Sequence, residues 1–134
     1  MAVPMELHKI IISEMMEQQI IMLKEVDGER KFPIVIGSSE AMAIDRRLKG
    51  IPTPRPLTHD LLANIIESMG GNIEKIEINN LENHTFFARI FIRQDGQVLE
   101  IDSRPSDAIA VAQRTRAPLY MAEQVIEEAV QAED

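Results

Sequence analysis

The residues DSRPSDA, Asp102–Ala108, mark a change from strand to helix and place two acids and one arginine at that turn. Pro105 fixes the backbone φ angle and suits the first turn of a helix. Ser106 is predicted to cap free backbone N–H groups there, and Asp107 lies where the helix dipole favours negative charge. The stretch therefore predicts a helix that begins directly after a strand. Sites of chemistry and ordinary helix caps both have this pattern, and caps are the more common.

The same order of elements is predicted twice in the chain. Strands over 7–13, 19–25 and 31–36 precede a helix over 40–48, and strands over 73–81, 85–93 and 97–101 precede a helix that runs to about Arg114. Asp27–Gly28 and Asp95–Gly96 are strong signals for hairpin turns. A short strand over 118–121 and a final helix over 122–132 complete the chain.

Two matching helix starts indicate an internal repeat. Ser39–Ile44, SEAMAI, and Ser106–Val111, SDAIAV, agree in residue type at all six positions and lie 67 residues apart. We therefore predict an α+β fold in which two β-meanders carry helices on their sheet or sheets, and we raise the hypothesis of an internal β-β-β-α duplication. The alternative is coincidence between two capped amphipathic helices.

A rigid connector separates the predicted helix over 40–48 from another helix over 59–69. Pro52, Pro54 and Pro56 are incompatible with a helix interior or a central strand. Thr58 is the expected cap of the second helix. Its apolar residues recur at helical spacing and predict a buried stripe, formed by Leu61, Leu62, Ile65, Ile66 and Met69.

Length and composition indicate one globular domain over residues 1–134, with its core over about 7–130. Hydrophobic residues make up 45% of the chain and charged residues 27%, as is usual for a globular protein. The absence of cysteine excludes disulfides, thiolate metal sites and a cysteine nucleophile. No apolar run reaches the length of a membrane helix, and the first residues do not resemble a signal peptide, so we expect a cytoplasmic protein.

The net charge of −8 works against indiscriminate binding to nucleic acid, because neutralisation of phosphates supplies most of that affinity. The basic residues are nevertheless clustered, which is compatible with a local basic face on an acidic protein. A solvated surface of mixed charge is the alternative. The clustered residues are Arg46, Arg47, Lys49, Arg55, Arg104, Arg114 and Arg116.

Four acids are candidate ligands of a metal ion. Glu40, Asp60 and Asp107 each lie in the first turn of a predicted helix, and Asp102 lies at the end of a predicted strand. If these helix starts converge, their oxygens suit Mg²⁺ or Mn²⁺. The alternative for each acid alone is that it complements the helix dipole and binds no metal.

A histidine and two arginines are further catalytic candidates beside Asp60 and Asp107. His59 is a candidate general base that a carboxylate would orient, although a lone histidine near a helix start is more often a hydrogen-bonding group. Arg55 and Arg104 each precede a proline and are candidate clamps for a phosphate. The alternative is that Arg104 forms a structural ion pair with Asp60 or Asp107. Neither a dinucleotide-binding or P-loop signature nor a Gly-x-Ser-x-Gly elbow is present.

Four ordered motifs resemble the bifunctional nuclease (BFN) domain family, and the resemblance covers about residues 7–130. They are Phe32–Gly37 with Glu40–Ala41, Arg55–Leu61, Thr85–Ala88 and Asp102–Ala110. The resemblance implies an α+β domain that forms oligomers, in a family found in bacteria and in some plant proteins. It also implies hydrolysis of DNA and RNA, with the motif positions Glu40, Arg55, His59, Asp60, Asp102, Arg104 and Asp107 as candidate site residues.

Two functions are therefore expected from the sequence. The first is a nuclease that hydrolyses phosphodiester bonds of DNA and RNA, assisted by Mg²⁺ or Mn²⁺ and assembled as a homo-oligomer. The second is a non-enzymatic oligomeric module that binds a small anionic ligand or a protein partner, because helix N-termini bind anions readily.

Overall fold

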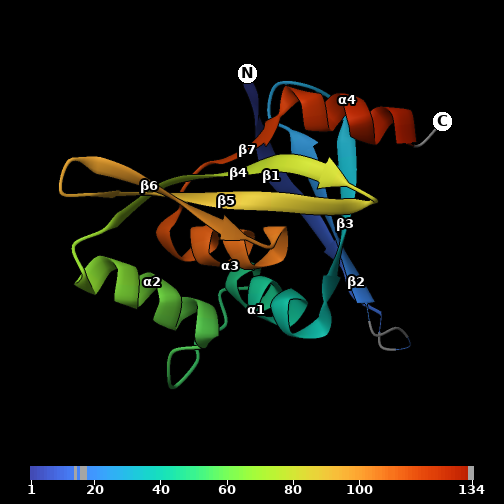
Figure 1. Cartoon of the computed structure of the whole chain (residues 1–134). Coiled ribbons are helices and arrows are strands. Elements are labelled where there is room, and N and C mark those ends of the chain that lie inside the picture. The colour runs from blue at the N-terminus through green and yellow to red at the C-terminus, as the bar shows by residue number, and fades with distance from the viewer. Residues whose placement is uncertain (14, 16–17, 133–134) are drawn as a thin grey trace.

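Seven strands form one sheet in the described part of the chain, which comprises residues 1–13, 15 and 18–132 of a computed structural model (Figure 1). Their order across the sheet is β3-β2-β1-β7-β4-β5-β6. The strands are β1 (Ala2–Ile11), β2 (Gln18–Glu25), β3 (Lys31–Gly37), β4 (Asn72–Glu82), β5 (Thr85–Gln94), β6 (Gln97–Ser103) and β7 (Leu119–Ala122). The helices are α1 (Ser38–Leu48), α2 (Thr58–Ser68), α3 (Pro105–Thr115) and α4 (Glu123–Ala132).

The sheet consists of two antiparallel meanders joined by β7. In each meander the first strand lies beside β7, which is antiparallel to β1 and parallel to β4. The helices that follow the meanders, α1 and α3, contact each other. This confirms the α+β fold with two meanders. The two meanders and their following helices occupy equivalent places on the two sides of β7, which agrees with the duplication hypothesis. Superposition of the two halves would test that hypothesis.

The start of β1 was not foreseen, since the strand begins at Ala2 rather than at residue 7 and ends at Ile11 rather than at residue 13. Val3 pairs with Met121 of β7, and Met5 pairs with Leu119. Pro4 lacks a backbone N–H, and a proline argues against a central strand when only the sequence is considered. Pairing with a strand near the other end of the chain therefore sets the true start of β1.

The predicted caps Thr58 and Ser106 are also wrong. Thr58 is the first residue of α2 after its N-cap Leu57, and Ser106 lies inside α3, whose N-cap is Arg104. Ser106 is buried, with 3% of its surface exposed. The cap function at α2 belongs instead to Asp60, whose Oδ2 accepts a hydrogen bond of 3.1 Å from the Leu57 backbone N–H.

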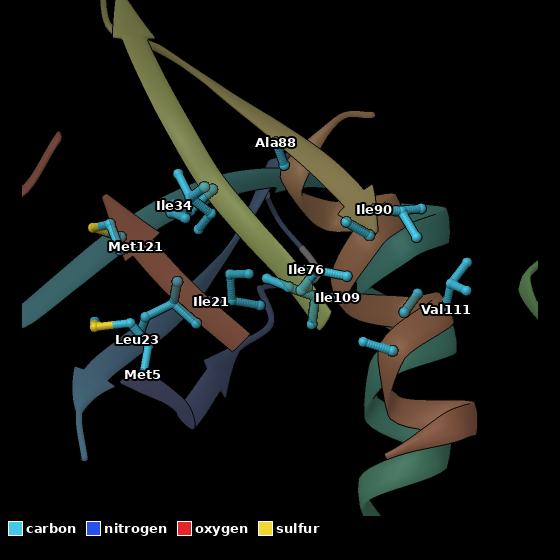
Figure 2. Packing of buried hydrophobic residues seen from close by; sticks show 14 of the residues in the cluster. Met5, Ile21, Leu23, Ile34, Ile76, Ala88, Ile90, Ile109, Val111 and Met121 are labelled. Atoms are coloured by element: carbon cyan, nitrogen blue, oxygen red, sulfur yellow. The ribbon is translucent and has the colours of Figure 1, made fainter. Parts of the chain in front are cut away.

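The core lies between the sheet and the helices, with α3 at its centre. In β3 the side chains of Phe32, Ile34 and Ile36 are buried whereas Pro33 and Val35 are exposed, which is the alternation of a strand with one buried face. Helix α3 contacts α1, α2, β4 and β5. Figure 2 shows buried side chains from both meanders, α3 and β7 in this cluster.

The predicted buried stripe of α2 is wrong, because most of it faces solvent. Leu61, Leu62, Ile65 and Met69 are 52%, 42%, 45% and 68% exposed, and Ile66 packs only partly against the core. Ala63 is the buried residue of the helix. Helix α2 therefore contacts α3 through a narrow side and leaves an apolar stripe uncovered. We call Leu61, Leu62, Ile65 and Met69 the α2 apolar surface.

Helices α1, α2 and α3 lie together on one side of β4 and β5, and α4 lies apart from them near β7 (Figure 1). Among the described residues, no helix has both the length and the apolar character needed to span a membrane.

Candidate functional site

A histidine and a carboxylate from two different helices meet at the starts of α2 and α3. Nε2 of His59 lies 2.9 Å from Oδ1 of Asp107, and the two residues are 48 positions apart in the chain. The His59 side chain is 14% exposed and the Asp107 side chain 37%. The sequence predicted that a carboxylate would orient His59, and the structure identifies it as Asp107 rather than the adjacent Asp60.

Packing of α2 beside α3 brings this pair together. Pro105 and Ser106, in the first turn of α3, are buried. Their burial fixes the position of the backbone that carries Asp107. Further along both helices, Arg114 donates a hydrogen bond of 3.1 Å to the side-chain oxygen of Asn64. Two side-chain contacts therefore join α2 to α3, one between His59 and Asp107 and one between Asn64 and Arg114.

Asp60 holds the start of α2 in place. Besides the Leu57 N–H, its carboxylate accepts a hydrogen bond of 3.3 Å from Arg47, and Arg114 Nε lies 4.0 Å away. Three elements therefore meet at one carboxylate, namely the ends of α1 and α3 and the start of α2. These contacts orient the turn of α2 that carries His59.

His59 lines a cavity of about 600 Å³ between α1, the proline connector and the start of α2. The volume is typical of a small-molecule site. Thr53 Oγ1 donates a hydrogen bond of 2.9 Å to the Arg55 carbonyl oxygen and so shapes the connector. We call this the His59 cavity; its lining residues include Met42, Arg46, Pro54, Arg55, Pro56 and Leu57.

Two further cavities share residues with the His59 cavity. The Arg116 cavity, of about 430 Å³, shares Arg46 and Thr53 with it and adds Arg47 and Arg116. The Arg114 cavity, of about 250 Å³, shares Thr53 and Arg55 with the first and adds Arg114. Together they form a cleft along the connector, which we call the arginine cleft.

The arginine cleft concentrates positive charge on an acidic protein. Its described lining residues include five arginines and one carboxylate, that of Asp60. In the described part of the chain, no ion pair or hydrogen bond engages the guanidinium groups of Arg46, Arg55 or Arg116. Guanidinium groups without a carboxylate partner are suited to bind phosphate. Five of the seven clustered basic residues therefore lie around one cleft, which is compatible with the local basic face expected from the sequence, and Lys49 and Arg104 do not line it.

Arg104, Asp102 and Glu40 occupy other places. Arg104 precedes α3 and lines a separate cavity of about 320 Å³ together with His84. Neither Asp60 nor Asp107 pairs with it among the described residues, so the structural ion pair considered for Arg104 is wrong. Asp102 lies on β6, directly opposite Arg89 of β5 in the register of the two strands. The Glu40 carboxylate lies over Gly37, in the space that a Cβ atom there would need.

The four predicted metal ligands do not gather in this arrangement. Over residues 1–13, 15 and 18–132, no three His, Asp or Glu side chains form a group that could hold a metal ion. The set Glu40, Asp60, Asp102 and Asp107 is therefore not preassembled, and its binding of Mg²⁺ or Mn²⁺ stays a prediction.

Sequence reasoning did not identify the way in which the arginines combine. Arg46 and Arg47 lie in the last turn of α1, and Arg114 and Arg116 lie at the end of α3. Their clustering in sequence was visible, but their common cleft depends on the contacts of α1 and α2 with α3. The run of prolines was the one local signal, because a rigid connector between two helices often shapes a cavity.

Comparison with known proteins gives relatives over most of the chain. An uncharacterized protein of Mycobacterium tuberculosis (strain ATCC 25618 / H37Rv) is 36% identical over 120 residues, which cover 90% of this chain and 71% of that protein. Bifunctional nuclease 2 of Oryza sativa subsp. japonica is 28% identical over 114 residues, covering 82% of this chain and 35% of that protein. Bifunctional nuclease 1 of Arabidopsis thaliana is 25% identical over 105 residues, covering 75% and 32%. The chain thus spans about a third of these plant proteins.

A family model gives the same relationship independently of any single relative. The model of the bifunctional nuclease domain matches residues 21–134, which include the starts of α1, α2 and α3 and the whole proline connector. The chain therefore belongs to the bifunctional nuclease domain family.

Proposed function

We propose that this protein hydrolyses phosphodiester bonds of DNA and RNA in the His59 cavity. The observation that carries the proposal is the pairing of His59 with Asp107 at the wall of a cavity that also contains Arg46 and Arg55. Family membership and the printed names of the plant relatives support a nuclease. The arginines offset the repulsion that an acidic protein exerts on a polyanion.

In this proposal His59 is the general base. An ionised Asp107 can only accept a hydrogen bond, so the neutral imidazole donates from Nε2 and keeps Nδ1 as its basic nitrogen. His59 takes a proton from a water molecule, and the water oxygen forms a bond to phosphorus as the bond to the leaving oxygen breaks. The leaving oxygen then receives a proton from solvent or from the protonated imidazole.

Arg46 and Arg55 are the proposed phosphate ligands. Their planar guanidinium groups bind two phosphate oxygens at once and stabilise the charge that develops during attack. We propose no step for Glu40, Asp60, Asp102 or Arg104. A role for Mg²⁺ or Mn²⁺ at the four acids stays a separate prediction, which the experiment below tests.

The first experiment is cleavage of single-stranded and double-stranded DNA and RNA by purified protein, with Mg²⁺, with Mn²⁺ and with EDTA. Cleavage should be lost in His59→Gln and in Asp107→Asn, with each variant shown to be folded by circular dichroism. His8→Gln, an exposed histidine of β1, is the matched control and should cleave normally. Equal cleavage by wild type and His59→Gln would reject the proposed base.

Asp102→Asn separates this mechanism from the metal prediction. The proposed mechanism leaves its cleavage unchanged, whereas loss of cleavage together with inhibition by EDTA would support the four-acid metal site.

A second candidate function is binding of a small anionic ligand without catalysis. The same observation of unpaired arginines in a cavity of small-molecule size favours it. Absence of cleavage under all conditions, together with saturable binding of a nucleotide that Arg55→Ala abolishes, would select this function over hydrolysis.

We also propose that the protein forms a homo-oligomer through the α2 apolar surface. Its four residues lie on one stripe of an amphipathic helix and are between 42% and 68% exposed. Exposed apolar patches on soluble domains commonly mark interfaces. The test of this assembly is given in the Discussion.

A further inference from the structure

The inference rests on the proposed function and concerns how the substrate approaches His59. The His59 cavity and the Arg116 cavity share four lining residues, which are Ala43, Arg46, Thr53 and Leu57. The two cavities are therefore neighbours, and a ligand long enough to occupy both would pass Arg46. The extension leads toward Arg47 and Arg116.

Arg116 has an unusual backbone for its residue type. It caps the end of α3 with φ +60° and ψ +29°, in the left-handed region where glycine is usual. A side chain there costs free energy that a glycine would avoid. Since Arg116 is exposed and has no ion-pair partner among the described residues, the fold gains nothing visible from its guanidinium.

The shape of the cleft favours a single strand over a duplex. His59 is only 14% exposed, so a phosphodiester must enter the cavity to reach it. A duplex holds its phosphates on a stiff cylinder with stacked bases, whereas a single strand can bend one phosphate inward. Met42, Pro54 and Leu57 offer apolar surface for an unstacked base beside the arginines.

We propose that Arg46, Arg47 and Arg116 form a track for the phosphates of single-stranded nucleic acid, which leads from the His59 cavity over the end of α3. Arg116 binds a phosphate outside the reaction centre. The ligand chemistry is the sugar–phosphate backbone, so both DNA and RNA strands fit the track.

The test is binding of fluorescently labelled oligothymidylate and oligouridylate of eight nucleotides, measured by anisotropy over a range of salt concentrations. Both proteins compared carry His59→Gln, so that the probe stays intact, and one also carries Arg116→Gly. We expect this substitution to weaken binding severalfold and to reduce the slope of log K against log salt concentration by about 0.7, the share of one single-strand phosphate contact.

Glycine at position 116 separates binding from stability. It suits φ +60°, so the thermal midpoint of Arg116→Gly should not fall, and weaker binding cannot then be ascribed to unfolding. Arg116→Lys keeps the charge and should retain most of the affinity. Arg93→Ala is the matched control, because Arg93 of β5 pairs with Glu74 of β4 and lines none of the three cavities.

Two results would overturn the track. One is an unchanged Kd and salt slope in Arg116→Gly with both probes, and the other is a duplex that binds as tightly as the single strands. Failure of the nuclease proposal gives a different pattern, namely no cleavage by the wild type while Arg116→Gly still weakens binding.

Discussion

The contacts of Asp60, which was predicted as a catalytic residue, stabilise the start of α2 in the structure. Its carboxylate accepts the backbone N–H that precedes α2 and lies near two arginines from other helices. The sequence correctly placed an acid in the first turn of a helix. It could not show that Arg47 and Arg114 converge on this acid from α1 and α3.

We predict that Asp60→Ala lowers the free energy of unfolding by about 1 kcal/mol, the usual cost of losing a helix cap. Urea denaturation measures the change. Asp45→Ala is the matched control, because among the described residues the Asp45 carboxylate pairs only with Lys49, whose side chain is 63% exposed, and its loss should cost less than that of Asp60. Equal losses in the two variants would contradict the cap function of Asp60.

Glu25 gives the protein a predictable dependence on acid. Its carboxylate binds Arg30 Nε at 2.6 Å, and this hydrogen bond lowers the pKa of Glu25 below its usual value of 4.5. A carboxyl whose pKa is lower in the folded state stabilises the fold above its unfolded-state pKa. That contribution is lost as the pH falls through the folded-state pKa.

Glu25→Gln should therefore be less stable than the wild type at pH 7, and the difference should shrink as the pH falls below 4.5. Denaturation curves across this pH range provide the measurement. Glu29→Gln, in the same turn, is the matched control. A difference that stays constant with pH would show that the Arg30 bond does not set this dependence.

The pair of His59 and Asp107 marks the limit of prediction for single residues. Both residues were identified as candidates because of their place in first turns, but the partner of His59 was not. Sequence spacing reports neighbours along one helix, and Asp107 reaches His59 only because α2 lies along α3. Contacts between helices depend on packing that no local pattern encodes.

Among the elements, turns were more predictable than ends. Asp95 and Gly96 have positive φ angles, as the predicted hairpin turn between β5 and β6 requires, and Asn83 and His84 have them between β4 and β5. The stripe of α2 was misleading because periodicity shows that a helix has an apolar side, but not which body covers that side. In β3, by contrast, buried and exposed residues alternate, as a strand with one buried face requires.

The link between α2 and β4 depends on close approach at Gly71. A Cβ atom there would lie 2.9 Å from Ile92 Cγ2, 3.0 Å from Ile66 Cγ2 and 3.1 Å from the Ile66 carbonyl oxygen. Backbone and branched side chains cannot yield easily, so Gly71→Ala should cost about 1–3 kcal/mol of stability.

Thermal or urea unfolding measures this loss, and Gly28→Ala is the control. A Cβ atom at Gly28 would meet only the flexible Glu25 side chain, at 3.1 Å or more. If Gly71→Ala is as stable as Gly28→Ala, the contact between α2 and β5 is looser than described.

For the whole molecule, the α2 apolar surface is the feature that a single copy leaves unexplained. We predict that the wild type self-associates and that Ile65→Glu shifts it toward monomer, because a charge buried in an apolar interface is costly. Sedimentation velocity over a range of concentrations measures the shift. Val35→Glu, at another exposed apolar position, should not change the assembly. A wild type that stays monomeric at high concentration would refute the interface.

The strand β7 has a consequence for the time at which the protein can fold. Residues 119–122 join the two meanders in the sheet, and they come after both meanders in the chain. During synthesis each meander can form as its own hairpin pair, but the sheet stays in two parts with unpaired edges on β1 and β4. The complete sheet, and with it the continuous core, must therefore wait until this late segment has left the ribosome. Nascent chains are exposed to edge-to-edge association until residues 119–122 have been made.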